Sequence, residues 1–301
     1  MSATSSRCFW TGSAGVPMAG LRTLALAFLP PLDHTSDFEA VCREVAEAGI
    51  TRIVLQEICG SINLTASDAG PRVARVLRET GLQAIACHGL EHKPFLLRQA
   101  DPDARRRMVD AQLDLMERAA ALGARTFVLH LGNYPDGAEP SAAWEPVARA
   151  LDLLAPRAAA AGIELALENS FRCTYLARNA AELAAFVASY AHPAVGVCLD
   201  SGHAHILDGA VAALEALRPH IVTMHLHDND GRQDLHLMPG QGTLDWADFM
   251  PHIASCPRLR HLETEALKPR LGGTLDEIEP IPPLGEIHAC YRALLNAQVP
   301  A

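Results

Sequence analysis

The stretch VGVCLDSGHAHILDGAVAALEALRPHIVTMHLHD (residues 195–228) holds two short apolar runs separated by a segment rich in Ala and Leu. The runs at 195–201 and 221–228 have the length and composition of buried strands, and the segment between them has helical spacing. Two strands that are joined through a helix pair in parallel by a right-handed crossover. The stretch therefore predicts one strand–helix–strand unit.

The same alternation continues through the rest of the chain. Helical patterns such as those at 37–49, 104–123 and 142–162 end at glycine, where a left-handed C-cap is expected. Eight strand and helix units match a closed (β/α)8 barrel, so we predict an α/β fold, a single-domain TIM barrel. An open doubly wound sheet would carry a glycine-rich loop after its first strand, and LALAFLPPLDH (24–34) contains no glycine. The other predicted strands are 21–28, 52–58, 83–89, 126–132, 163–169 and 260–266.

No linker or change of composition divides the chain. We expect residues 1–20 to form a disordered leader and residues 21–298 to form the barrel. The apolar start of the barrel resembles a short secretory segment, but acidic residues follow it directly and no cleavage site does, so a first strand is the preferred interpretation. The Pro-rich segment 276–286 is expected to connect to a last helix at 286–297. The sequence has no apolar run of about 18 residues, so it predicts no membrane span.

Charge and cysteine content narrow the partners and the compartment. The formal net charge is −10, which disfavours nucleic acid as a partner because DNA binding depends on Lys and Arg. The basic run at 105–107 lies in a helical pattern and is expected to be a solvated helix face rather than a phosphate-binding patch. The eight cysteines form no Cys-x-x-Cys pair, which fits a reducing cytoplasm.

Titratable side chains stand where the predicted strands end. The active sites of parallel barrels form at the C-terminal ends of the strands, so these side chains are expected to converge. Asp234 and His236 lie in the loop after the seventh strand. The residues at the strand ends are His88, His130, Glu168, Asp200 with His203, His225, His227, Glu263 and Glu265.

Each of these residues also has a purely structural interpretation. A single histidine can be a hydrogen-bonded core residue, Glu168 can cap the next segment, and Asp200 can be a helix N-cap. Their convergence is harder to explain in this way, because buried carboxylates are costly unless they are paired or bind a cation. Histidines and carboxylates without thiolates suit Mn²⁺, Zn²⁺, Co²⁺ or Fe²⁺. We therefore predict a divalent metal site.

Strand alternation orders the candidates further. Residues at i and i+2 share a face, so His225 and His227 both point to the barrel mouth. One of them can bind metal while the other contacts substrate or orients a ligand. The same alternation makes Glu263 and Glu265 competitors for one role.

Four motifs resemble the xylose isomerase-like TIM-barrel superfamily. They are ALEN (166–169), CLDSGHAH (198–205), HLHDNDGRQDLHLMPGQGTLDW (225–246) and HLET (261–264). This group contains sugar and sugar-phosphate isomerases and epimerases, together with the AP endonucleases of the endonuclease IV type (family 2). The resemblance extends from about residue 21 to the last helix.

The isomerase branch implies one divalent ion, Mn, Zn, Co or Mg, and the nuclease branch of the same superfamily implies up to three. The reaction would be isomerisation or epimerisation of a small sugar, sugar acid, cyclitol or sugar phosphate through an enediolate, with catalytic Glu168 and Glu263 moving the proton. The partner would be a small carbohydrate, and homo-oligomers are common in this branch. The implied metal ligands are Glu168, Asp200, His225 and Glu263, and the implied substrate contacts are His88, His203, His227 and Arg232.

The nuclease branch is the alternative. It implies a multinuclear Zn or Mn hydrolase that cleaves phosphodiesters with metal-bound hydroxide. The acidic net charge argues against DNA as the substrate. In such nucleases the loops after the early strands penetrate DNA, and here the loop HGLEHKPFLLRQAD (88–101) offers Lys93, Phe95, Leu96 and Arg98. An apolar lid over a small sugar explains Phe95 and Leu96 at least as well as DNA penetration does. We therefore prefer the isomerase or epimerase. The implied ligands of three ions are His88, His130, Glu168, Asp200, His203, His225, Asp234, His236 and Glu263.

Overall fold

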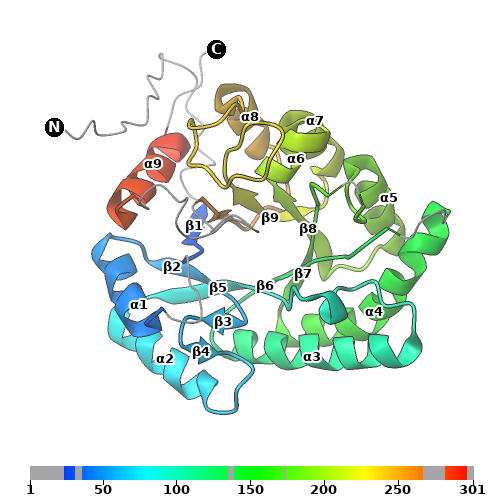
Figure 1. The fold of residues 1–301 in the computed structure, drawn as a ribbon, viewed down its shortest axis with the longest axis horizontal. Coiled ribbons are helices and arrows are strands. Elements are labelled where there is room, and N and C mark those ends of the chain that lie inside the picture. Colours follow the sequence, from blue (N-terminus) through cyan, green and yellow to red (C-terminus); the bar gives the residue numbers. More distant parts are fainter. Residues whose placement is uncertain (1–23, 31–35, 135–138, 173, 267–281, 297–301) are drawn as a thin grey trace.

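Eight parallel strands close into a barrel, in the order β1, β10, β9, β8, β7, β6, β5, β2 (Figure 1). The structure is a computed structural model that describes residues 24–30, 36–134, 139–172, 174–266 and 282–296. Each of the eight predicted apolar runs contains one barrel strand, so the predicted (β/α)8 fold is confirmed. The strands are β1 (Ala25–Phe28), β2 (Arg52–Leu55), β5 (Gln83–His88), β6 (Thr126–Leu129), β7 (Glu164–Glu168), β8 (Val195–Asp200), β9 (Ile221–Leu226) and β10 (His261–Thr264).

Helices surround the barrel and cover its outer face (Figure 1). Side-chain caps begin several of them, such as Asp37 before α1 and Asn179 before α5. Gly162 ends α4 with φ of 68°, as the sequence predicts, and Gly81 ends α2 in the same way with φ of 73°. The helices are α1 (Phe38–Glu47), α2 (Ala69–Thr80), the 3-10 helix η2 (Lys93–Phe95), α3 (Pro102–Ala121), α4 (Pro140–Ala161), α5 (Ala180–Tyr190), α6 (Ser201–Leu207), α7 (Ala210–Leu217), α8 (Trp246–Ile253) and α9 (Leu284–Asn296).

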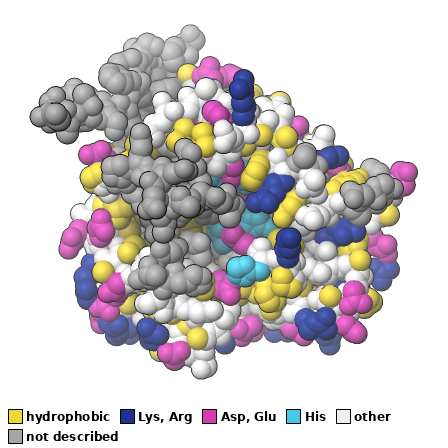
Figure 2. Space-filling model, in the orientation of Figure 1, with side chains coloured by type: hydrophobic (Ala, Val, Ile, Leu, Met, Phe, Trp, Pro, Cys, Tyr) yellow, Lys and Arg dark blue, Asp and Glu magenta, His cyan; other side chains and the backbone are white. Residues whose placement is uncertain are grey.

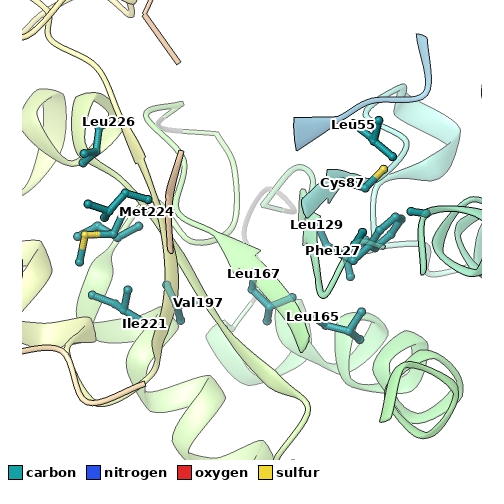
Figure 3. Close-up of a cluster of buried hydrophobic side chains, with 14 of the residues drawn as sticks. Leu55, Cys87, Phe127, Leu129, Leu165, Leu167, Val197, Ile221, Met224 and Leu226 are labelled. Atoms are coloured by element: carbon teal, nitrogen blue, oxygen red, sulfur yellow. The ribbon is translucent and has the colours of Figure 1, made fainter. Parts of the chain in front are cut away.

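The main core lies between the strands and the helices. Leu165 and Leu167 of β7 belong to the same apolar cluster as Leu183 of α5, and Figure 3 shows the strand side chains of this cluster. The alternate residue Ala166 belongs to a separate small cluster inside the barrel. Because side chains alternate along a strand, the arrangement that packs the leucines outward points Glu168 into the barrel at its mouth.

Some of the other predicted segments are present in the structure, and others lie outside the described residues. The predicted last helix is present as α9, and Arg106 and Arg107 are exposed on α3, as expected for a solvated helix face. An antiparallel hairpin of β3 (Ile58–Cys59) and β4 (Ile62–Asn63) follows β2 and was not predicted. The expected leader at 1–20 and most of the Pro-rich connection lie outside the described residues. Within the described ranges, no helix is long and apolar enough to cross a membrane.

Candidate metal centre

A cavity of about 330 Å³ opens at the C-terminal ends of the strands. In Figure 2, histidine and carboxylate side chains are visible in the centre of this face, with Lys and Arg side chains beside them. The histidine and carboxylate side chains that line the cavity are Glu91, His130, Glu168, His203, Asp234, His236 and Glu265. A second set does not line it and is almost completely buried, namely His88, Asp200, His225, His227 and Glu263. The strand ends therefore converge as predicted, at two depths.

The first group of side chains surrounds Nδ1 of His225. This nitrogen lies 3.6 Å from Oε1 of Glu168 and 3.8 Å from Oδ2 of Asp200. It also lies 3.4 Å from Oε1 of Glu265. Asp200 has a structural role as well, because its Oδ1 accepts a hydrogen bond from the backbone N–H of His203 and caps α6. The metal-ligand and N-cap interpretations of Asp200 are thus compatible.

The second group lies deeper, on the other ring nitrogen of His225. Oε2 of Glu263 is 3.4 Å from Nε2 of His225 and 3.5 Å from Nε2 of His88. The other carboxylate oxygen of Glu263 accepts hydrogen bonds from Thr223 and His261. Glu263 is 0% exposed, whereas Glu265 lines the cavity. The two competing glutamates therefore occupy different depths.

The third group joins Asp234 to two histidines. Nε2 of His203 and Nε2 of His236 lie 3.5 Å and 3.1 Å from Oδ2 of Asp234. On each ring, Nδ1 must donate to a backbone carbonyl, at Asn169 and Glu265 respectively, because a carbonyl can only accept. Each Nε2 therefore faces the carboxylate with a proton or a cation between them, which is the arrangement typical of metal-binding histidines.

The donor set fits a divalent cation. Two atoms bound to one ion at about 2.0 to 2.2 Å lie about 3.0 to 3.6 Å apart. The separations around His225 are close to this range and longer than good hydrogen bonds. Among the described residues, both ring nitrogens of His225 and one carboxylate oxygen each of Glu263 and Asp234 are buried without a hydrogen-bond partner. The two groups that share His225 are Glu168–Asp200–His225 and His88–His225–Glu263, with ligand atoms within 4.8 Å of one another.

The electrostatics keep the carboxylates ionised. Burial alone would raise the pKa of Glu168, but the neighbouring His130 and His225 imidazoles outweigh it and hold this pKa well below its ordinary value. Burial would likewise lower the pKa of His203, but Asp200 and Asp234 raise it to about 10. The pKa of Glu263 is also held well below its ordinary value, because hydrogen bonds from histidines outweigh its burial. Ionised carboxylates are the form that binds a cation, and a protonated imidazole would release its proton to solvent when it binds one.

Of the four substrate-contact residues that the resemblance implies, only one lines the cavity. His203 lines it, whereas His88 and His227 lie beneath its floor. His227 instead bonds Asp200, with Nε2 at 2.9 Å from Oδ1. Arg232 is exposed and does not line the cavity. From the loop 88–101, Leu96 lines the cavity while Lys93 is exposed, and Phe95 is half-buried against the core.

Asp228 explains why so many polar residues follow β9. Its Oδ1 accepts hydrogen bonds from the backbone N–H of Asn229 and Leu244, and its Oδ2 accepts from Gly240 and from Nε1 of Trp246. One buried carboxylate thus fixes both ends of the loop that carries Asp234 and His236. Sequence reasoning missed this role and the support that His261 gives to Glu263; its position two residues before Glu263 was the available signal.

Gly202 is expected to be essential for the packing of this site. A Cβ atom at residue 202 would clash with Cε1 of His227 and lie 2.6 Å from its Nδ1. We therefore expect Gly202→Ala to lower the free energy of unfolding by about 1 to 3 kcal/mol, measured by urea denaturation. Gly70→Ala in α2 is the matched control, because nothing lies within 4 Å of a Cβ there. Equal stability of the two variants would contradict the rigid placement of His227.

Comparison with known proteins relates this geometry to a family. Residues 42–256 match the family described as the xylose isomerase-like TIM barrel. The chain is 29% identical over 238 residues to the protein y4fM of Sinorhizobium fredii, covering 70% of this chain and 75% of that protein. It is 28% identical over 200 residues to a probable endonuclease 4 of Chlorobium phaeobacteroides, covering 59% of this chain and 70% of that protein.

Solved structures share the fold at low identity. A D-tagatose 3-epimerase-like protein has a TM-score of 0.76 at 16% identity, covering 90% of this chain and 97% of its own. The IOLI protein, solved with a zinc atom, also has a TM-score of 0.76, at 14% identity and with coverage of 90% and 98%. At these identities the likeness establishes the barrel fold alone.

Proposed function

The chain belongs to the xylose isomerase-like TIM-barrel family, and on this premise we propose that it is a divalent-metal-dependent isomerase or epimerase of a small carbohydrate. The substrate class is a sugar, sugar acid, cyclitol or sugar phosphate. The observation that carries the proposal is that Glu168 and Glu265 converge on one nitrogen of His225 and also line the cavity. Two carboxylates that border the same small cavity can take a proton from a substrate and return it.

The proposed roles follow the depth of each residue. Glu168 and Glu265 line the cavity and act as the acid–base pair. Glu263 faces Nε2 of His225, on the opposite side of the ring from Glu168 and Asp200, so it would orient this histidine rather than bind the same cation. The sequence motif favours Glu263 as the second catalytic carboxylate, and our proposal moves that role to Glu265 because a proton acceptor must be within reach of the substrate. Glu168, Asp200 and His225 would hold the cation. When bound, the cation would act as a Lewis acid that stabilises negative charge developing on the substrate oxygens.

The size and charge of the cavity support a small substrate. Its volume of about 330 Å³ is at the lower end of the range for small-molecule sites, which is about 300 to 1,000 Å³. Four carboxylates line it, and the whole chain carries a formal charge of −10. Such a surface would repel a DNA backbone rather than bind it.

Exchange of substrate protons with solvent tests the proposal. We expect the metal-loaded protein to incorporate deuterium from D₂O into carbon-bound positions of at least one ketose, aldose or sugar acid of a panel, detected by mass spectrometry. Chelation should abolish the incorporation, which controls for uncatalysed exchange. A protein that binds panel members without exchanging any proton, or that hydrolyses a phosphodiester instead, would contradict the assignment.

The second candidate function is a multinuclear hydrolase, which the Asp234 group favours. Asp234 lies within 3.5 Å of both His203 and His236, which a one-metal isomerase does not require as ligands. The two histidines also belong to two further groups of potential ligands, Asp200–His203–His227 and His227–His236–Glu265. The probable endonuclease 4 among the relatives points in the same direction. The number of ions per chain separates this candidate from the isomerase.

A further inference from the structure

We propose that Arg172 binds an anionic group of the substrate, a phosphate or a carboxylate. The substrate would then be a sugar phosphate or sugar acid rather than a neutral sugar or cyclitol. This inference rests on the proposed small-carbohydrate function and specifies its substrate class. It moves the role of substrate-binding arginine from Arg232, which is exposed away from the cavity, to an arginine that lines it.

The charge distribution around the cavity sets Arg172 apart. It is the only Lys or Arg among the described residues that line the cavity. Among the residues that the structure describes, no carboxylate oxygen lies within 4.0 Å of the Arg172 guanidinium. This holds although four carboxylates line the same cavity, namely Glu91, Glu168, Asp234 and Glu265. An arginine that its acidic neighbours do not neutralise remains available for an anion from outside.

The side chain of Arg172 is held in place without a salt bridge. Its guanidinium carbon lies 5.3 Å from the ring centroid of Phe171 and 5.3 Å from that of Tyr175. Cation–π contacts of this kind leave the N–H groups in the guanidinium plane free to bind the oxygens of an anion. Arg172 is exposed, and these two ring contacts restrict its side chain before a ligand arrives, which reduces the entropy cost of binding.

Backbone hydrogen bonds also hold the described residues on either side of Arg172. The backbone N–H of Ser170 donates to the carbonyl of Ala177, and that of Tyr175 donates to the carbonyl of Arg172. The N–H of Leu176 donates to the carbonyl of Gly132, which ties the loop after β7 to the loop after β6. A loop closed in this way can present a charge at a defined place on the wall of the cavity.

The anionic group and the reacting carbon of such a ligand would contact different parts of the cavity. An anionic ligand entering this acidic cavity needs positive charge to offset the repulsion. Arg172 supplies it on the wall formed by the loop after β7, while the reacting carbon and its oxygens would face Glu168 and Glu265. Phosphate and carboxylate both match the planar fork of a guanidinium, so the chemistry is shared and the experiment distinguishes the two.

Ligand affinities of matched compounds test the inference without turnover. The probes are D-fructose, D-fructose 6-phosphate, D-glucuronate and inorganic phosphate, with binding to the metal-loaded full chain measured by calorimetry. We expect wild type to bind an anionic probe at least about 10-fold more tightly than D-fructose, and Arg172→Gln to remove about 10- to 100-fold of that affinity. Affinity for D-fructose should change little.

Arg178→Gln is the matched control. Arg178 also stacks on an aromatic ring, with its guanidinium carbon 5.3 Å from the centroid of Tyr134, but it does not line the cavity. This variant should keep the preference for anionic probes. The inference is overturned if wild type shows no such preference, or if Arg172→Gln retains it. Preserved preference without proton exchange in any assay would contradict the proposed isomerase and leave the role of Arg172 standing.

Discussion

Glu168→Gln is expected to lower the rate of proton exchange between substrate and solvent by about 10²- to 10⁴-fold. Glutamine has nearly the same shape but cannot accept the substrate proton, and it removes one charge from the cation site. Glu168 is 4% exposed, lines the cavity and lies 2.9 Å from Nε2 of His130, so its carboxylate is both ionised and accessible. Exchange is measured in D₂O with metal-loaded protein.

Glu164→Gln provides the control on the same strand. Glu164 begins β7, at the opposite end of the barrel from the cavity, and bonds Arg258 and Arg260. Its replacement should leave the exchange rate within about twofold of wild type, because surface salt bridges contribute little. A Glu168→Gln protein with near-normal exchange would end the two-carboxylate mechanism.

The two glutamates at the end of β10 can be separated in the same assay. Glu265→Gln should lower the exchange rate while the metal content stays unchanged, because Glu265 lines the cavity but is not one of the three residues, Glu168, Asp200 and His225, whose ligand atoms lie within 4.8 Å of one another. Glu263→Gln should lower both the exchange rate and the metal content, because the buried Glu263 faces Nε2 of His225 and orients this metal-holding histidine. The opposite pattern would restore Glu263 as the proton-transfer residue that the sequence motif indicates.

This division shows where sequence reasoning stops. Alternation of side chains predicts that Glu263 and Glu265 share a face, and the structure places both inside the barrel. How deeply each glutamate lies in the barrel depends on the tilt and register of the neighbouring strands. In this barrel the register places Glu263 of β10 beside His225 of β9. The sequence thus predicts membership of the site but not which glutamate meets the substrate.

Loop residues were harder to predict than strand residues. The eight strands were predicted because each apolar run has the length and composition typical of a buried strand. The alternation of side chains along a strand then gives the direction of the side chain at its last residue. Arg172 and Arg232 both lie in loops, where side-chain direction depends on long-range hydrogen bonds such as Leu176 to Gly132. No local pattern around either arginine indicates which of them reaches the cavity.

Removing the metal is the second large perturbation. Buried carboxylates that lose a bound cation regain their mutual repulsion, so the metal-free protein should be less stable. A ligand present at about 1,000 times its Kd contributes about 4 kcal/mol, and Tm changes by about 2 to 4 °C per kcal/mol in domains of about 150 to 250 residues. We therefore expect chelation to lower Tm by about 10 °C and to abolish proton exchange, with both restored by Mn²⁺, Zn²⁺, Co²⁺ or Mg²⁺.

The number of ions decides between the two candidate functions. Plasma mass spectrometry of purified protein should give about one ion per chain, as a four-ligand isomerase site implies, and Asp234→Ala should keep that ion. The reason is that His203 and His236 are oriented by backbone carbonyls, so the third group does not depend on a cation for its geometry. Two or three ions in wild type, with one lost in Asp234→Ala, would make Asp234 a ligand. Phosphodiester hydrolysis would then replace proton transfer as the reaction of this site.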